Sequence, residues 1–100
     1  MRLTVKHIVN FKLRDNSDEQ KLKAKEVLLS MKGNVPMLRG IEVGIDFLGS
    51  ARSYDVILQV FLDDEASLEA YQQDPYHCSV VKKHMHAVTE TSVAVDYYVD

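Results

Sequence analysis

Apolar and polar residues alternate along four segments of this chain of 100 residues, and such a period of two predicts β-strands. The four segments are residues 5–13, 41–47, 54–61 and 91–99. In the first, the odd positions are apolar except for His7. In the last, one face carries Val93, Val95, Tyr97 and Val99. A flexible turn rich in serine and glycine, residues 49–53, joins the second and third strands.

Apolar residues recur every three or four positions in the remaining segments, which predicts three helices. The first is expected at residues 18–31, and its apolar stripe consists of Leu22, Val27, Leu28, Leu29 and Met31. Ser17 and Gln20 have the spacing of a capping box at its start. Gly33 stands where a left-handed C-terminal cap is expected.

The second helix is expected from Glu65 to about Asp74, because Pro75 disfavours helical geometry in the residue before it. Asp63 and Asp64 precede this helix, where its dipole favours negative charge. A third helix follows Pro75. Its predicted inner stripe is His77, Val80, Val81, His84, Met85 and Val88.

The resulting order of strand, helix, two strands, two helices and strand predicts an α+β fold of ferredoxin-like architecture. In this architecture a four-stranded antiparallel sheet has its helices on one face. The opposite face is expected to include several apolar residues, namely Ile8, Ile57, Phe61 and Ala94. We therefore expect two sheets to pack face to face in a homodimer.

Composition narrows the class of protein. A chain of this length fits a single domain over residues 1–100, and a formal charge of −3 argues against nucleic-acid binding. No apolar run is long enough for a membrane helix or a signal peptide, so no membrane partner is expected. The single cysteine, Cys78, has no partner for an internal disulfide, which indicates a reducing, cytoplasmic environment.

Four side chains that could take part in catalysis are expected between the sheet and the helices: His7, Tyr71, His77 and His84. Histidine exchanges protons near neutral pH, and a tyrosine hydroxyl can donate to a developing oxyanion. These residues suffice for proton transfer around an apolar pocket. The alternative is that each is a buried side chain whose polar atoms bond to neighbouring groups.

Other chemistry has less support in the sequence. His84 and His86 are two residues apart, so a helix directs them apart, and His77 is two turns from His84. We therefore expect no metal site and no cofactor. Cys78 faces a different direction from His77 on a helix, which disfavours a thiolate–imidazole pair.

Several segments resemble the stress-responsive A/B barrel (Dabb) family over nearly the whole chain. They are VKHIV at residues 5–9, YDVIL at residues 54–58, LEAYQQDPYH at residues 68–77 and VDY at residues 95–97. The most specific part is the tyrosine, proline and histidine at the end of the second helix. The resemblance implies a dimeric α+β barrel, in which two ferredoxin-like subunits pair through their sheets.

The same resemblance implies two functional classes, because the family includes proteins of undefined activity and a plant polyketide cyclase. Catalytic residues carried over from the cyclase are His77 as general base, Tyr71 as hydrogen-bond donor to a carbonyl, and His7 as a pocket residue. Many members have histidine immediately before the proline, where this chain has Asp74. That carboxylate could orient or charge His77, or cap the helix.

Two hypotheses follow. In the first, the protein is a stress-responsive A/B barrel homodimer of undefined biochemical activity, with a small apolar pocket that binds a small molecule or has no ligand. In the second, it is a cofactor-independent enzyme, like a polyketide cyclase, a lyase or an isomerase. His77 would then remove a proton next to a carbonyl that Tyr71 polarises.

Overall fold

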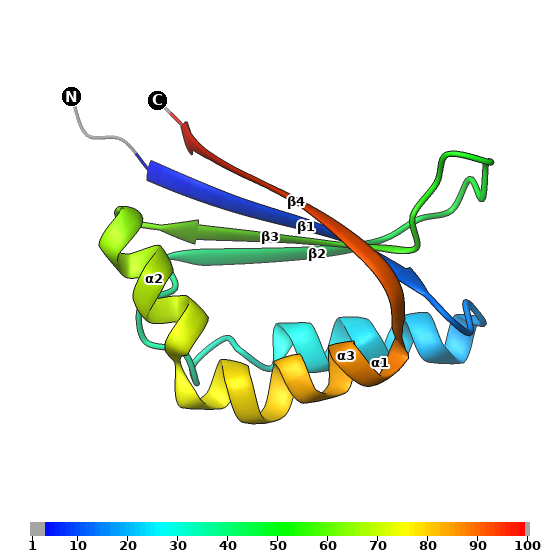
Figure 1. Ribbon diagram of the computed structural model, residues 1–100, viewed down its shortest axis with the longest axis horizontal. Coiled ribbons are helices and arrows are strands. Elements are labelled where there is room, and N and C mark those ends of the chain that lie inside the picture. Colours follow the sequence, from blue (N-terminus) through cyan, green and yellow to red (C-terminus); the bar gives the residue numbers. More distant parts are fainter. Residues whose placement is uncertain (1–3, 100) are drawn as a thin grey trace.

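A computed structural model describes residues 4–99 (Figure 1). Its elements follow the predicted order, with the third helix divided into a π-helical part, η1, and an α-helical part, α3. They are β1 (Thr4–Leu13), α1 (Asp18–Leu29), β2 (Gly40–Ile45), β3 (Val56–Leu62), α2 (Glu65–Gln73), η1 (His77–Lys82), α3 (Lys83–Val88) and β4 (Thr89–Val99). The four strands form one antiparallel sheet in the order β2-β3-β1-β4, with all helices on one face. The predicted ferredoxin-like architecture is therefore confirmed.

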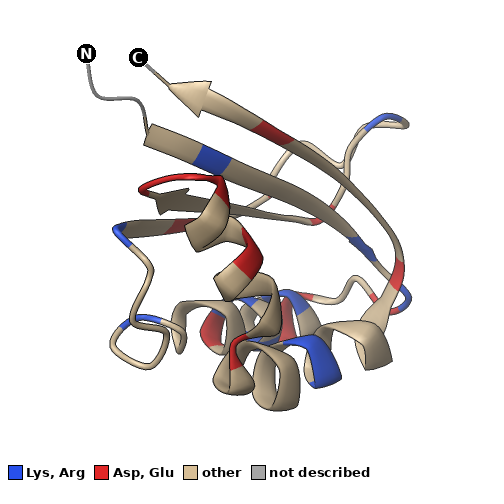
Figure 2. Ribbon diagram, turned by 60° about the vertical axis from the view of Figure 1, so that its left-hand side comes forward, with Lys and Arg blue, Asp and Glu red and all other residues tan. Residues whose placement is uncertain are grey.

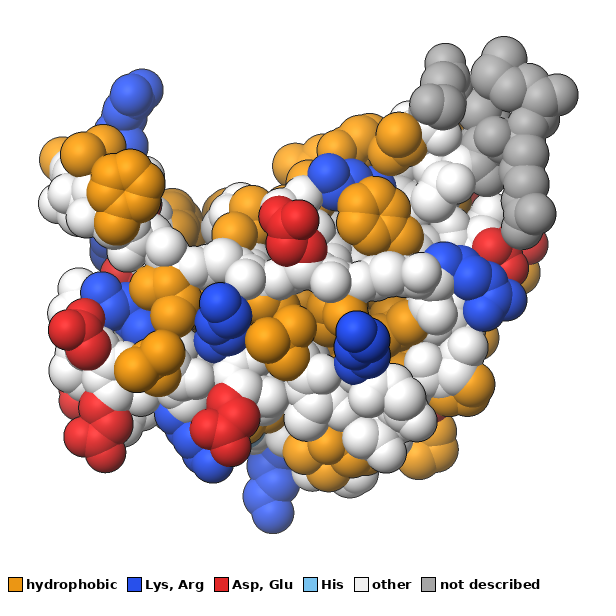
Figure 3. All heavy atoms as spheres, turned by 180° about the vertical axis from the view of Figure 1, so that it is seen from behind, with side chains coloured by type: hydrophobic (Ala, Val, Ile, Leu, Met, Phe, Trp, Pro, Cys, Tyr) orange, Lys and Arg blue, Asp and Glu red, His pale blue; other side chains and the backbone are white. Residues whose placement is uncertain are grey.

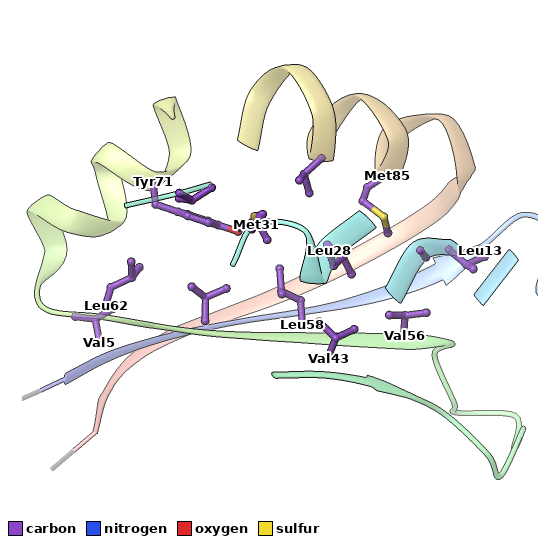
Figure 4. Close-up of a cluster of buried hydrophobic side chains, with 14 residues drawn as sticks. Val5, Leu13, Leu28, Met31, Val43, Val56, Leu58, Leu62, Tyr71 and Met85 are labelled. Atoms are coloured by element: carbon purple, nitrogen blue, oxygen red, sulfur yellow. Dashed lines mark hydrogen bonds between the residues drawn. The ribbon is translucent and has the colours of Figure 1, made fainter. Parts of the chain in front are cut away.

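The main core lies between the helices and the inner face of the sheet, as Figure 4 shows. The odd residues of β1 and the even residues of β3 point to this face, as their alternation predicts, since paired residues of neighbouring strands share a face. Helix α1 contributes Ala24 and Leu28, and Met31 follows just after it. These three recur at four- and three-residue spacing, so they line one side of the helical segment.

Two details of the first predicted helix are wrong. Leu22 is 60% exposed and Leu29 is 36% exposed, because they lie two residues from Ala24 and one residue from Leu28, both of which point inward. Ser17 does cap the helix by accepting a hydrogen bond from the Gln20 backbone at 3.4 Å. The reciprocal bond of a capping box is absent, because the Ser17 amide donates to Asp15 instead.

Gly33 has the predicted positive φ of 84°, but it lies in the turn beyond the end of α1. The strand bounds differ from the prediction at the hairpin between β2 and β3. Phe47 and Tyr54 lie outside the strands, and Phe47 is 97% exposed. The predicted alternation therefore runs into the loop, where no neighbouring strand pairs with it.

The predicted face of β4 is wrong, because Ala94 lies on the inner side of the sheet. It pairs with Val9, as Asp96 pairs with His7, and antiparallel partners share a face. The outer, helix-free face of β4 instead carries Val93, Val95 and Tyr97, all of them exposed. The outer face is therefore still apolar, but β4 contributes Val93, Val95 and Tyr97 to it in place of the predicted Ala94.

Both positively and negatively charged residues occur on strands, loops and helices (Figure 2). Within residues 4–99, none of the helices has the length and apolar character required to cross a membrane.

Candidate functional site

A cavity of about 250 Å³ lies between the inner face of β1 and β4 and the helical segments α2, η1 and α3. Its wall contains both apolar and polar side chains, and each of these elements contributes polar ones. The lining residues are His7, Val9, Phe11, Leu28, Leu58, Tyr71, Gln72, His77, Val81, Lys82, Met85, His86, Thr89, Ser92 and Ala94. The structure thus brings together His7, Tyr71 and His77, three of the four predicted candidates.

His7 is held by a carboxylate that the sequence analysis did not single out. Its Nδ1 forms a short hydrogen bond with Asp96, which lies directly opposite on β4. The imidazole is buried, whereas the carboxylate side chain is 42% exposed. Such a bond fixes the orientation of the ring.

Tyr71 and His77 form a stacked pair, with ring centroids 4.3 Å apart and planes inclined by 27°. Tyr71 comes from α2 and also meets His7 edge-on, with centroids 5.6 Å apart. Its hydroxyl donates to the Met31 sulfur at 3.8 Å, and Figure 4 shows the ring directed toward Met31. Burial, assisted by the charge of Asp74, raises the pKa of Tyr71, so the hydroxyl keeps its proton at neutral pH.

The pKa of His77 is lowered, mainly because burial disfavours the charged ring. The positive charges of Lys82 and His7 lower it further, while Asp74 and the Tyr71 backbone oppose this effect. Nδ1 of His77 is buried without a hydrogen bond of normal geometry to residues 4–99. Because its pKa is lowered, the His77 ring is mainly neutral near pH 7, and a neutral imidazole has one nitrogen that can accept a proton.

Asp74 caps the helical turn that begins at Pro75 and leads into η1. Its carboxylate accepts the backbone N–H of His77 at 2.9 Å, and its carbonyl accepts the backbone N–H of Cys78. The sequence left two roles open for Asp74, and these hydrogen bonds are those of a helix cap. The negative charge of Asp74 also raises the pKa of His77, but less than burial lowers it. The buried carboxylate thereby fixes the position of the His77 backbone.

The inner stripe of the third predicted helix is only partly right. His77, Val81 and Met85 are buried, at intervals of four, whereas Val80 is 40% exposed. The π-helical turn at residues 77–82 accounts for this spacing, because it has more residues per turn than an α-helix.

His84 is half-buried and does not line the cavity, so this predicted site residue lies apart from the others. His86 lines the cavity instead. No group of three metal-ligating side chains occurs within residues 4–99. Cys78 is exposed, and its thiol donates to the Gln72 carbonyl at 3.3 Å.

Comparison with known proteins identifies the family. The model of the Stress responsive A/B Barrel Domain, Dabb, matches residues 5–99. A dimeric protein of unknown function and ferredoxin-like fold from Bacteroides fragilis is 28% identical, with 96% of each chain covered and a TM-score of 0.80. A dimeric ferredoxin-like protein of unknown function from Thermobifida fusca is 24% identical, with 99% of this chain and 93% of that chain covered and a TM-score of 0.83.

The hydroxynitrile lyase from Passiflora edulis has the same fold at 16% identity, with a TM-score of 0.81 over 97% of this chain and 94% of the lyase. No curated protein sequence matches the chain. The family match runs from Val5 in β1 to the end of β4 and includes the residues that line the cavity. The chain therefore belongs to the stress-responsive A/B barrel domain family.

Proposed function

We propose that the protein binds a small, largely apolar molecule with a carbonyl group in the cavity between the sheet and the helices. The cavity supports this proposal because its wall combines apolar side chains from the sheet and the helices with histidine, tyrosine, lysine and hydroxyl groups. Small-molecule sites bury a ligand against apolar side chains and orient it with polar groups. With about 250 Å³, the cavity suits a small metabolite.

The cavity further supports acid–base chemistry on that molecule, with His77 as the general base. The observation that carries this step is the buried, neutral His77 beside a second histidine that Asp96 holds in place. Because the pKa of His77 is lowered, its ring is ready to accept a proton from a carbon next to the carbonyl. Two histidines in such different surroundings are suited to different roles in one reaction.

Tyr71 is the proposed hydrogen-bond donor to the carbonyl oxygen. Its raised pKa keeps the hydroxyl protonated, and its acceptor in the structure, the Met31 sulfur, is a weak one. A carbonyl oxygen that gains negative charge would be a much stronger acceptor. His7, oriented by Asp96, is the proposed third pocket residue. Proton transfer of this kind requires no cofactor.

We also propose that the protein is a homodimer joined through the outer faces of its two sheets. The relatives from Bacteroides fragilis and Thermobifida fusca are described as dimeric. In this chain, β4 and its neighbours leave apolar side chains uncovered on the outer face. A second sheet would remove this surface from water.

The test combines binding with isotope exchange. A panel of small ketones and keto acids is screened by thermal shift, and the ligands that stabilise the protein are incubated with it in heavy water. Proton NMR then follows the loss of the signal next to the carbonyl. We expect exchange in the wild type, and in the His77→Asn variant a rate of exchange that is lower by at least about 100-fold.

Two further variants complete this experiment. Asp96→Asn is expected to slow exchange as well, because it removes the charge that orients His7. His84→Asn is the matched control, since His84 lies on the neighbouring helical turn outside the cavity wall. Binding without exchange would leave a non-catalytic binding protein, the first of the two hypotheses. A panel in which no compound stabilises the protein would contradict both steps.

A further inference from the structure

The cavity has a second polar region, formed by Lys82, His86, Thr89 and Ser92. The strand register shows where this region lies relative to the one around His7. His7 lies opposite Asp96, whereas Ser92 lies opposite Phe11, four residues further along β1. At the rise of a β-strand, these two positions are about 13 Å apart. His7 and Ser92, which both line the cavity, therefore lie in two separate regions of its wall.

Lys82 supplies the positive charge of this second polar region, apart from the proposed catalytic residues. It ends η1, is half-buried, and forms no ion pair within residues 4–99. Its charge reaches into the site, since it contributes to the lowered pKa of His77. His86 follows four residues later, so the two side chains lie on the same side of the helical segment.

The hydroxyl of Thr89 supplies an independent observation. Its Oγ1 is buried and has no hydrogen-bond partner within residues 4–99, although the residue lines the cavity. A buried hydroxyl without a partner is uncommon in folded proteins, and an acceptor from a bound molecule would satisfy it. The exposed Ser92 adds a second hydroxyl to the same part of the wall.

None of the described lining residues is an aspartate or a glutamate. Within the cavity wall the charge of Lys82 therefore meets no compensating carboxylate, and the groups around it can donate hydrogen bonds. A half-buried lysine with neighbouring hydrogen-bond donors is suited to an anion.

We propose that the ligand carries a carboxylate, which Lys82 binds with help from His86 and Thr89. The apolar body of the ligand then packs along the cavity wall and brings its carbonyl group toward His77 and Tyr71. The substrate class is a small, mainly aliphatic oxo acid, with the carbonyl several carbons from the carboxylate. This inference rests on the proposed function and adds the charge of the ligand and the residue that selects it.

Calorimetric titration tests the inference with two probes of almost equal shape, 7-oxooctanoate and its methyl ester. We expect the acid to bind the wild type about tenfold more tightly than the ester, because only the acid gains a charge-assisted hydrogen bond. The Lys82→Gln variant is expected to lose this preference while it binds the ester as the wild type does. Lys83→Gln is the matched control, because Lys83 is exposed and outside the cavity wall.

Equal affinity of the wild type for the two probes would overturn the inference and leave the proposed function in place. A preference for the acid that persists in Lys82→Gln would overturn the role of Lys82. If neither probe binds and no compound of the screening panel does, the proposed function itself fails. The comparison of acid and ester in the wild type needs no variant, so it holds even if Lys82→Gln does not fold.

Discussion

Burial determines the chemistry of the two stacked rings at the site. The same loss of water raises the pKa of Tyr71 and lowers the pKa of His77, because in each case it disfavours the charged form. At neutral pH the site therefore combines a protonated hydroxyl with an imidazole that lacks its second proton. Those are the states that a hydrogen-bond donor and a general base require.

The lowered pKa of His77 predicts a loss of stability in acid. As pH falls below the ordinary histidine value of about 6.5, the unfolded chain takes up a proton that folded His77 resists. Above about pH 6.5 the titration of His77 leaves the free energy of unfolding unchanged. Below this pH the free energy of unfolding falls by at most about 1.4 kcal/mol per pH unit, until the pH reaches the lowered pKa of folded His77. Urea denaturation between pH 5 and 8 measures this slope.

The His77→Asn variant is the reference for that measurement, because it keeps a polar side chain but removes the titration. Its free energy of unfolding is expected to fall less steeply in acid than that of the wild type. Parallel pH curves for the two proteins would contradict the assignment of the lowered pKa to His77.

At the level of residues, the sequence predicted the site in part. His7, Tyr71 and His77 converge on one cavity because each lies on the inner side of its own strand or helix, which periodicity reveals. Asp96 was missed, because its position depends on the pairing of β4 with β1. Both faces of β4 contain apolar residues, so its alternation alone does not decide which face is inside.

At the level of elements, local signals set most of the helix boundaries. Ser17 caps α1 and Asp64 caps α2, and both are residue types with a strong preference for that position. The π-helical turn of η1 has no comparable signal. Its effect is that His77, Val81 and Met85 face inward while His84 leaves the cavity wall. A π turn inside a helical segment is common at functional sites, and here it begins at the proposed base.

Asp74 is predicted to stabilise the start of this helical segment. Replacing it with alanine removes the acceptor of the His77 backbone N–H, and we expect a loss of about 1 kcal/mol in the free energy of unfolding. Asp74→Asn keeps a side-chain acceptor at the cap and is expected to lose much less. Urea denaturation of both variants at pH 7 measures the difference, and equal losses would show that the cap contributes little.

At the level of the whole molecule, the fold was predictable because alternation and helical periodicity together define a layered α+β arrangement. The helices cover only part of this sheet, and β4 is exposed along nearly its whole length. Figure 3 shows hydrophobic side chains on the tip of the projecting loop between β2 and β3 and along the adjacent upper edge. The distribution of uncovered apolar surface is what leads from the single chain to the proposed dimer.

Val95 lies on the outer face of β4 and is 61% exposed, so a lysine there is compatible with the fold of a single chain. In a dimer joined through the sheets, the same lysine would be buried without a partner. We expect Val95→Lys to weaken association at least about 100-fold, since an unpaired buried charge costs several kcal/mol. Light scattering over a range of concentrations should then report a mass near 11.4 kDa for the variant and near twice that for the wild type. Ala70→Lys, at an exposed position of α2, is the control and should remain dimeric. A monomeric wild type, or a variant that associates as strongly as the wild type, would contradict pairing through this face.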